Sequence, residues 1–189
     1  MALNDGSSPP GAAGSGPASL GPGSSADNLS AFPTLTPEMF AGLGLRVEEV
    51  GVVIVDHGSR RAESNELLLR VVDLFRETTG LPLVEAAHME LAEPSIATAV
   101  DRVVAQGARL VVAHPYFLSP GRHWRHDIPE LVSQAVARHD GVRHLVTAPL
   151  GLHPLMQRIM QHRIWHCLQR AMQQGAACDA CEAEQGCGS

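Results

Sequence analysis

The chain has 189 residues, a net charge of −6, and 14 basic residues, all of them arginine. The negative balance and the lack of a basic run argue against a nucleic-acid-binding surface, and no stretch of sequence reaches the roughly 20 apolar residues that span a bilayer. Hydrophobic residues make up 44% of the chain but aromatic residues only 4%, which favours an aliphatic core of parallel strands covered by helices.

Residues 1–47 are rich in Gly, Ser, Pro and Ala and show neither a helical nor a strand period, so we expect them to be disordered. A plastid transit peptide is one explanation, because such segments are rich in serine, but they are usually also rich in arginine and poor in acidic residues. The segment contains Asp5, Asp27 and Glu38 and no basic residue before Arg46. A flexible tail is therefore the alternative.

Residues 48–173 show regular periods and predict one domain, which a cysteine-rich tail over 174–189 follows. Strands are expected at 50–55, 81–87, 109–114 and 142–148, and helices at about 63–78, 95–106, 128–136 and 156–171. The first strand is apolar throughout, which is typical of a strand buried on both faces. This alternation predicts an α/β fold with right-handed crossovers and a four-stranded parallel sheet in the order 2-1-3-4.

The carboxyl ends of the first three strands carry polar side chains and meet at one edge of the predicted sheet. His57 follows the first strand in the run Asp-His-Gly-Ser, residues 88–93 follow the second strand, and a longer loop over 114–127 follows the third. Open α/β sheets bind their ligands at this edge. A neutral imidazole there can bind a metal or accept a proton near pH 7, although His57 could also be an ordinary turn histidine.

The third loop contains the run Gly121–Asp127, GRHWRHD. If His123 faces His57, a carboxylate from 88–93 completes a site of two imidazoles and one oxygen, which suits Fe, Co, Ni or Zn. We expect Glu90 to be this ligand. Glu93 precedes a predicted helix, where a carboxylate stabilises the positive helix end, so its expected role is structural.

Several donors could hold an anionic ligand at the same edge. Arg122 and Arg125 flank His123, and guanidinium groups bind carboxylates bidentately; a solvated loop surface is the alternative for both. Ser59 and Arg60 offer further donors after the first strand. Trp124 could cover a flat apolar ligand, but an aromatic side chain that anchors the loop is the commoner case.

Four cysteines lie close together near the end of the chain, at positions 167, 178, 181 and 187. Crowded cysteines of this kind indicate metal ligands rather than a disulfide framework. By spacing alone, zinc and an iron–sulfur centre are nearly equal choices. Cys167 lies on an apolar helical stripe, so a buried core cysteine is its alternative role.

The motifs VDHGSRR, AHMELAEPS, FLSPGRHWRHDIP, TAPLG and HCLQR, followed by the clustered cysteines, resemble the sirohydrochlorin ferrochelatases of plants and algae. These are short class II tetrapyrrole chelatases, and the resemblance covers about 48–189. It implies a lyase that inserts Fe²⁺ into sirohydrochlorin to give sirohaem, with release of two pyrrole protons. It further implies a homodimer, a chloroplast location, and an iron–sulfur cluster, of the [2Fe–2S] rather than the [4Fe–4S] type, on Cys167, Cys178, Cys181 and Cys187.

With this resemblance, we assign His57 as principal base and metal contact, His123 as metal contact and second base, and Glu90 as metal ligand or counter-charge. Arg122, with Ser59 and Arg60, would hold the substrate's peripheral carboxylates. Ligand type alone does not separate iron from other metals. A cobalt or nickel chelatase acting on a related corrinoid precursor is therefore one alternative, a non-catalytic carrier of metal or tetrapyrrole is another, and the location is cytoplasmic if the first segment is not a transit peptide.

Overall fold

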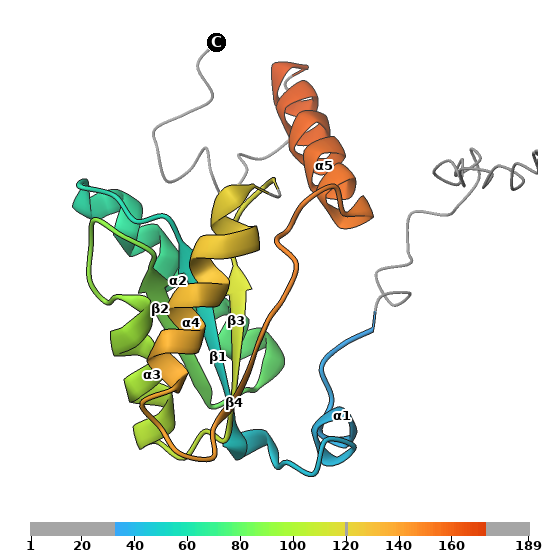
Figure 1. Ribbon diagram of the computed structural model, residues 1–189. Helices are drawn as coiled ribbons and strands as arrows, with labels where there is room; N and C mark the ends of the chain where they lie inside the picture. The colour runs from blue at the N-terminus through green and yellow to red at the C-terminus, as the bar shows by residue number, and fades with distance from the viewer. Residues whose placement is uncertain (1–32, 120, 173–189) are drawn as a thin grey trace, which may run out of the picture. The chain divides into compact units, whose positions relative to one another are not determined.

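Figure 1 shows the computed structural model, which describes residues 33–119 and 121–172. Its elements in chain order are α1 Pro37–Ala41, η2 Val47–Glu49, β1 Val50–Asp56, α2 Ala62–Thr79, β2 Leu83–His88, α3 Ile96–Ala105, β3 Leu110–Pro115, η3 His123–Asp127, α4 Ile128–Val136, β4 Arg143–Val146 and α5 Pro154–Ala171. The strands form one parallel sheet in the order β2-β1-β3-β4. This arrangement confirms the predicted fold class and strand order.

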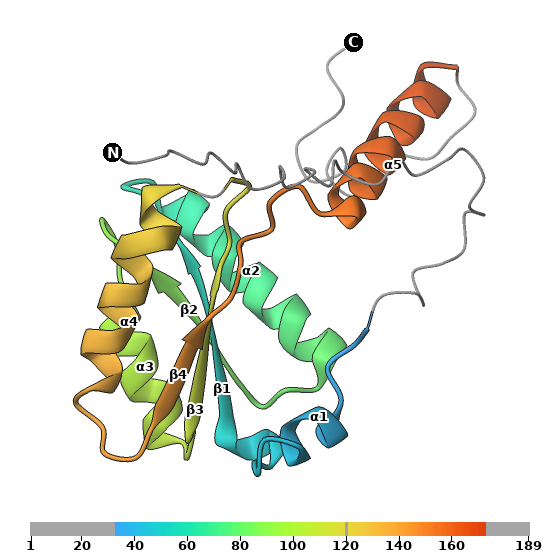
Figure 2. The same cartoon turned by 45° about the vertical axis from the view of Figure 1, so that its right-hand side comes forward.

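Side chains of β1 are buried on both faces of the sheet. Val53 and Val55 belong to the core that lies under α3 and α4, whereas Val52 and Ile54 belong to the core that α2 covers. Figure 2 shows α2 on one side of the sheet and α3 and α4 on the other. Covering both faces explains why β1 is an unbroken apolar run instead of an alternating one.

All four observed strands begin and end within one or two residues of the predicted ones, and β4 is the one that is shorter at both ends. The sequence predicts a strand over 142–148, but the structure forms β4 only over Arg143–Val146. This strand pairs with β3 alone, and its Leu145 is 42% exposed. An edge strand with exposed side chains gains little from burial, so its length does not follow from its hydrophobic residues.

The segment before β1 differs from the sequence prediction. We expected disorder through residue 47, but the structure forms α1 and η2 there, and buries Phe40 and Leu45. These two side chains pack with Val50 and Leu110 at the start of the central strands. Two buried side chains are too few to give a periodic signal, which is why this part was missed; residues 1–32 lie outside the described residues.

A second difference concerns the loop after β3, which was expected to continue through residue 127. The structure instead forms the π-helical turn η3 over His123–Asp127, and this turn leads directly into α4 at Ile128. Such turns are rare and occur frequently at functional sites. His123 therefore lies on a helical turn whose far end is held by the buried side chain of Ile128.

The last helix, α5, buries none of its residues. Its apolar side chains recur every four residues at Met160, Ile164 and Leu168, Met172 follows just past its end, and all four are more than half exposed. In the part of the chain that the structure describes, no helix is long and apolar enough to cross a membrane. The apolar stripe of α5 is thus a solvent-exposed surface of this single chain.

Candidate functional site

His57 and Glu90 meet at the carboxyl edge of the sheet, as the sequence predicts. His57 follows β1 directly, and Glu90 follows β2 by two residues. The His57 Nε2 atom lies 2.7 Å from Glu90 Oε1, and the His57 Nδ1 atom lies 3.3 Å from the Gly58 carbonyl oxygen. About half of each side chain is exposed. Both ring nitrogens of His57 therefore face a hydrogen-bond acceptor.

His123 completes the predicted pair of imidazoles. Its ring centroid lies 5.4 Å from that of His57, and the two rings are edge-to-face at 72°. His123 Nδ1 lies 2.7 Å from Asp127 Oδ2, one turn further along η3. Because a carboxylate only accepts hydrogen bonds, Nδ1 carries the hydrogen. The neutral His123 ring therefore has its free electron pair on Nε2.

Trp124 and His114 fix the same loop to the end of β4. The Trp124 indole N–H donates to the Thr147 carbonyl oxygen at 2.9 Å, so this residue anchors the loop, as expected for the commoner role of an aromatic side chain. His114 Nδ1 lies 2.7 Å from the Thr147 hydroxyl, which itself donates to Ala148. Burial lowers the pKa of His114, because the charged form loses hydration inside the protein.

The backbone turn after His57 is held by a second, buried histidine. His88 is 1% exposed, and its Nδ1 atom lies 2.6 Å from Asp56 Oδ1. The same Asp56 oxygen accepts the backbone N–H of Gly58 at 2.9 Å. Gly58 has a φ of +83°, and a Cβ there would collide with the carbonyl oxygen of Glu90. Only glycine therefore fits between the two strand ends.

Of the predicted substrate-binding donors, Ser59 and Arg60 lie in the turn between β1 and α2. The Ser59 backbone N–H donates to Asn65 Oδ1 at 2.9 Å, and the Asn65 side chain donates back to the Ser59 carbonyl at 2.8 Å. The Ser59 hydroxyl accepts the backbone N–H of Arg61 at 3.1 Å. Ser59 thus stabilises the start of α2 through its backbone and its hydroxyl oxygen. Arg60 is exposed.

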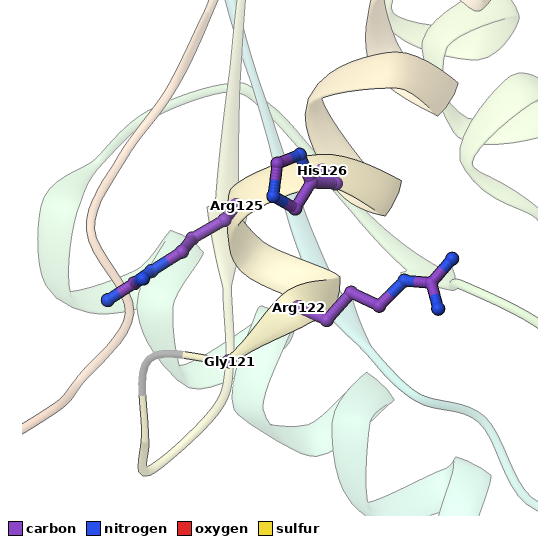
Figure 3. A pocket seen from close by; sticks show the side chains of 4 residues that line it. All are labelled: Gly121, Arg122, Arg125 and His126. Atoms are coloured by element: carbon purple, nitrogen blue, oxygen red, sulfur yellow. The ribbon is translucent and has the colours of Figure 1, made fainter.

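Arg122 and Arg125 line an open pocket of about 520 Å³ together with Gly121 and His126. Figure 3 shows the two guanidinium groups extending in opposite directions from the turn. The Arg122 side chain is 84% exposed, and its Nε lies 3.7 Å from Asp127 Oδ1. The two arginines therefore present separate positive charges to solvent on either side of the turn, instead of forming one clamp.

Glu93 has the structural role that the sequence predicts. Its Oε2 atom accepts the Ser95 backbone N–H at 2.7 Å and the Thr98 hydroxyl at 3.1 Å. These hydrogen bonds, led by that from Ser95, lower the pKa of Glu93. In the described ranges no three His, Cys, Asp or Glu side chains converge as a preformed metal site, so the predicted set of His57, His123 and Glu90 is not assembled as one.

The structure describes one of the four predicted cluster ligands. Cys167 lies near the end of α5 and its side chain is exposed, so it is not a buried core cysteine. Exposure suits a ligand that reaches a cluster together with other segments. Cys178, Cys181 and Cys187 lie outside the described residues.

Sequence reasoning missed three residues of this site. Asp127 follows His123 by four residues, the spacing of contacts within a helix, but the segment was expected to be a loop. Asp56 and His88 end neighbouring strands, and the pairing of β1 with β2 places them opposite each other. A signal for this pair was present, because both residues are polar and both follow apolar strands.

Known proteins similar to this chain include a plant protein and two bacterial proteins of solved structure. The Arabidopsis thaliana protein named sirohydrochlorin ferrochelatase, chloroplastic, is 50% identical over 137 residues, which are 72% of this chain and 61% of that protein. A CbiX protein from Marinobacter aquaeolei, described as putative and of cobalamin biosynthesis, superposes with a TM-score of 0.57 at 30% identity, over 64% of this chain and 98% of that one. The sirohydrochlorin chelatase SirB from Bacillus subtilis, in complex with cobalt, superposes with a TM-score of 0.58 at 28% identity, over 61% of this chain and 50% of that one.

The chain spans less than two thirds of the length of its Arabidopsis relative. A protein-family model, CbiX, matches residues 51–167, which include all four strands and both histidines of the site. This match covers more than half of the chain and shows that the chain belongs to the CbiX family.

Proposed function

We propose that this chain is a metal chelatase, a lyase, that inserts Fe²⁺ into sirohydrochlorin to form sirohaem and releases two pyrrole protons. The observation that carries the proposal is the approach of His57 to His123, with 5.4 Å between ring centroids, at the ligand-binding edge of a parallel sheet. The name of the Arabidopsis relative, sirohydrochlorin ferrochelatase, supports iron as the metal.

The two histidines divide the chemistry of chelation. The pyrrole nitrogens must lose two protons while the metal exchanges its water for nitrogen ligands. His57 lies between two acceptors, Glu90 at 2.7 Å and the Gly58 carbonyl at 3.3 Å, so each N–H that the ring carries after accepting a pyrrole proton has a hydrogen-bond partner. His57 is therefore the principal base, and it contacts the metal when its ring is neutral.

His123 is the better metal contact of the two. Its Nδ1–H donates to Asp127, which leaves the electron pair of Nε2 for the ion or for the second pyrrole proton. Glu90 supplies negative charge beside His57. The Glu90 carboxylate can bind the metal when its contact with the His57 imidazole breaks. The substrate's peripheral carboxylates would bind Arg122, with Ser59 and Arg60 as further donors.

The test is anaerobic incubation of the purified chain with sirohydrochlorin and Fe²⁺, followed by absorption. We expect catalytic formation of sirohaem, and a decrease of about 10²- to 10⁴-fold in His57→Ala and His123→Ala, the range of general acid–base catalysis. His144→Ala is the matched control, because His144 is exposed on β4 and away from this edge. Parent-like rates in both site variants would exclude the proposed site.

Cobalt or nickel insertion into a related corrinoid precursor is the second candidate, since imidazole and carboxylate ligands also suit these metals. The SirB structure in complex with cobalt supports cobalt as an alternative metal. Competition between Fe²⁺, Co²⁺ and Ni²⁺ at equal concentration separates the alternatives by the product formed. A carrier, in contrast to an enzyme, would yield at most one metallated tetrapyrrole per chain.

A homodimer is part of this proposal. The apolar stripe of α5, with Ile164 58% and Leu168 58% exposed, is an unfavourable surface for a solvated monomer. The chain also superposes on half of SirB, so two copies would match one longer chelatase. Analytical ultracentrifugation should give a dimer that Ile164→Glu combined with Leu168→Glu dissociates, whereas Leu152→Glu, at a 93% exposed position outside α5, leaves it intact.

An iron–sulfur cluster on the four cysteines is a further part of the proposal, supported by their crowding and by the exposure of Cys167. Four cysteine thiolates can hold either a [2Fe–2S] or a [4Fe–4S] cluster. We expect the [2Fe–2S] type. Anaerobically purified protein should contain iron and acid-labile sulfide, and should show a cluster signal in electron paramagnetic resonance after reduction. Cys167→Ser should lower the cluster content; protein that lacks both iron and sulfide would contradict the assignment.

We also propose a plastid location, from the name of the Arabidopsis relative. A fusion of residues 1–47 to a fluorescent protein, expressed in plant cells, tests whether this segment directs import. Fluorescence that stays in the cytosol would favour the cytoplasmic alternative.

A further inference from the structure

Asp56 and His88 contact each other at the base of the site. His88 is 1% exposed and, within the described ranges, it is the one charged or polar residue in the buried core. Its Nδ1 lies 2.6 Å from Asp56 Oδ1, and the Asp56 side chain is 24% exposed. A carboxylate cannot donate, so the imidazole does. A buried polar pair of this kind costs hydration and persists only when its hydrogen bonds are made.

One oxygen atom of Asp56 joins three parts of the chain. It accepts the His88 ring N–H from the end of β2 and the Gly58 backbone N–H from the turn after β1. Two backbone hydrogen bonds continue this connection: Met89 donates to the Asp56 carbonyl at 2.9 Å, and Glu90 donates to the His57 carbonyl at 3.1 Å. The loops that carry His57 and Glu90 are therefore joined at their base.

The packing around Gly58 leaves this geometry little freedom. A Cβ at Gly58 would collide with the Glu90 carbonyl oxygen and would lie 3.0 Å from the His88 Cβ. A displacement of His88 thus moves the backbone on both sides of the contact between His57 and Glu90. The His88 ring itself is too deeply buried to touch a macrocycle.

We propose that Asp56 and His88 form a positioning pair, which holds the loops that carry His57 and Glu90 side by side at the metal-binding edge of the sheet. Its catalytic consequence rests on the function proposed above, but its effect on metal affinity does not. Carboxylate–histidine contacts behind a metal site orient the ligands, and their loss typically costs about 10- to 100-fold in affinity or activity.

The test compares two amide variants of one buried residue. In His88→Asn the side-chain amide lies where Nδ1 lies and can still donate to Asp56, whereas in His88→Gln the amide lies further out, near the position of Nε2. Co²⁺ alone is the probe, and its affinity is measured by visible absorption and calorimetry. Metallation of sirohydrochlorin is measured separately, as kcat and KM.

We expect His88→Gln to bind Co²⁺ about 10- to 100-fold more weakly and to lose kcat more than KM rises, while His88→Asn stays within about threefold of the parent. Val103→Ala is the stability control, because Val103 is buried against Gly51 at the opposite end of β1. It should lower the Tm and leave Co²⁺ affinity unchanged. If His88→Gln does not fold, Asp56→Ser removes the shared oxygen at a partly exposed position.

Parent-like Co²⁺ affinity in His88→Gln or Asp56→Ser would overturn the proposal, as would an equal loss of affinity in Val103→Ala. A parent protein that does not metallate sirohydrochlorin, but whose Co²⁺ affinity still falls in His88→Gln, would remove the proposed function and keep the positioning pair.

Discussion

The imidazole of His57 contacts that of His123 edge-to-face, although 65 residues separate them in the chain. His57 directly follows the central strand β1, whereas His123 begins the turn that leads into α4. The contact therefore depends on two independent features, the pairing of β1 with β3 and the helical turn η3. Substitutions of side chains that support the strand pairing, or of side chains that support the turn, should show how much each feature contributes to the contact between the two histidines.

Glu90 should contribute to chelation and Glu93 should not. We expect Glu90→Gln to lower the metallation rate about 10- to 100-fold, because the amide removes the negative charge and the carboxylate oxygen that lie 2.7 Å from the His57 ring. Glu93→Gln is the matched control: it weakens the hydrogen bonds to Ser95 and Thr98 at the start of α3 and should affect thermal stability only. Steady-state rates and melting curves of both variants check this. Equal rate losses would show that the loop, not the Glu90 charge, is decisive.

Asp127 should act through His123. Asp127→Ala removes the acceptor at 2.7 Å from Nδ1, so the ring can turn and either nitrogen can carry the hydrogen. We expect Co²⁺ affinity to fall about 10- to 100-fold, and Asp127→Asn, whose amide oxygen still accepts, to restore most of it. Calorimetric titration measures both. Unchanged affinity in Asp127→Ala would mean that His123 needs no such partner.

Two glycines with positive φ distinguish backbone strain from collision. Gly58 and Gly80 have φ values of +83° and +70°, but only at Gly58 would a Cβ collide with neighbouring atoms. We expect Gly80→Ala to lower the free energy of unfolding by about 1 kcal/mol, the cost of a left-handed backbone. Gly58→Ala should cost more and should also abolish metallation. Urea unfolding of both variants provides the comparison, and equal costs would contradict the close approach.

His114 should make stability depend on pH. Burial lowers the pKa of His114 in the folded chain below the ordinary value of 6.5. As the pH falls through 6.5 the unfolded chain therefore takes up this proton first, and folding stability decreases down to the folded pKa. His114→Asn keeps a donor for Thr147 but cannot titrate. Between pH 6.5 and the folded pKa, the free energy of unfolding of the variant should therefore fall less steeply than that of the parent, with a difference in slope of at most about 1.4 kcal/mol per pH unit. Urea unfolding at pH 5 to 8 tests this; identical slopes would exclude His114 as the source.

Most of the fold could be predicted because burial leaves a clear sequence signal. The valine run of β1 and the apolar faces of α2, α3 and α4 gave the strand order without any side-chain detail. Phe40 and Leu45 were missed because isolated contacts leave no period, and β4 is shorter than expected because an edge strand gains little from burial. In the site, strand ends brought His57 and Glu90 together correctly, but a π-helical turn has no sequence signature that sets it apart from a loop.

The exact partners of the histidines were beyond sequence reasoning. Whether Glu90 binds a metal or pairs with an imidazole depends on distances of a few tenths of an ångström. The buried contact of His88 with Asp56 depends on strand register, which the sequence sets only through the alternation of side chains. The sequence shows which chemical groups lie near the site, whereas the three-dimensional structure shows which of these groups contact each other.

Both imidazoles of the site come from a single chain, and this has a consequence for mixed assemblies. If His57→Ala and His123→Ala chains are combined in one dimer, neither subunit can borrow the missing ring from the other. Reconstituted hybrids should therefore show no complementation, and a hybrid of one parent and one inactive chain should retain about half of the parent activity, as independent half-sites would.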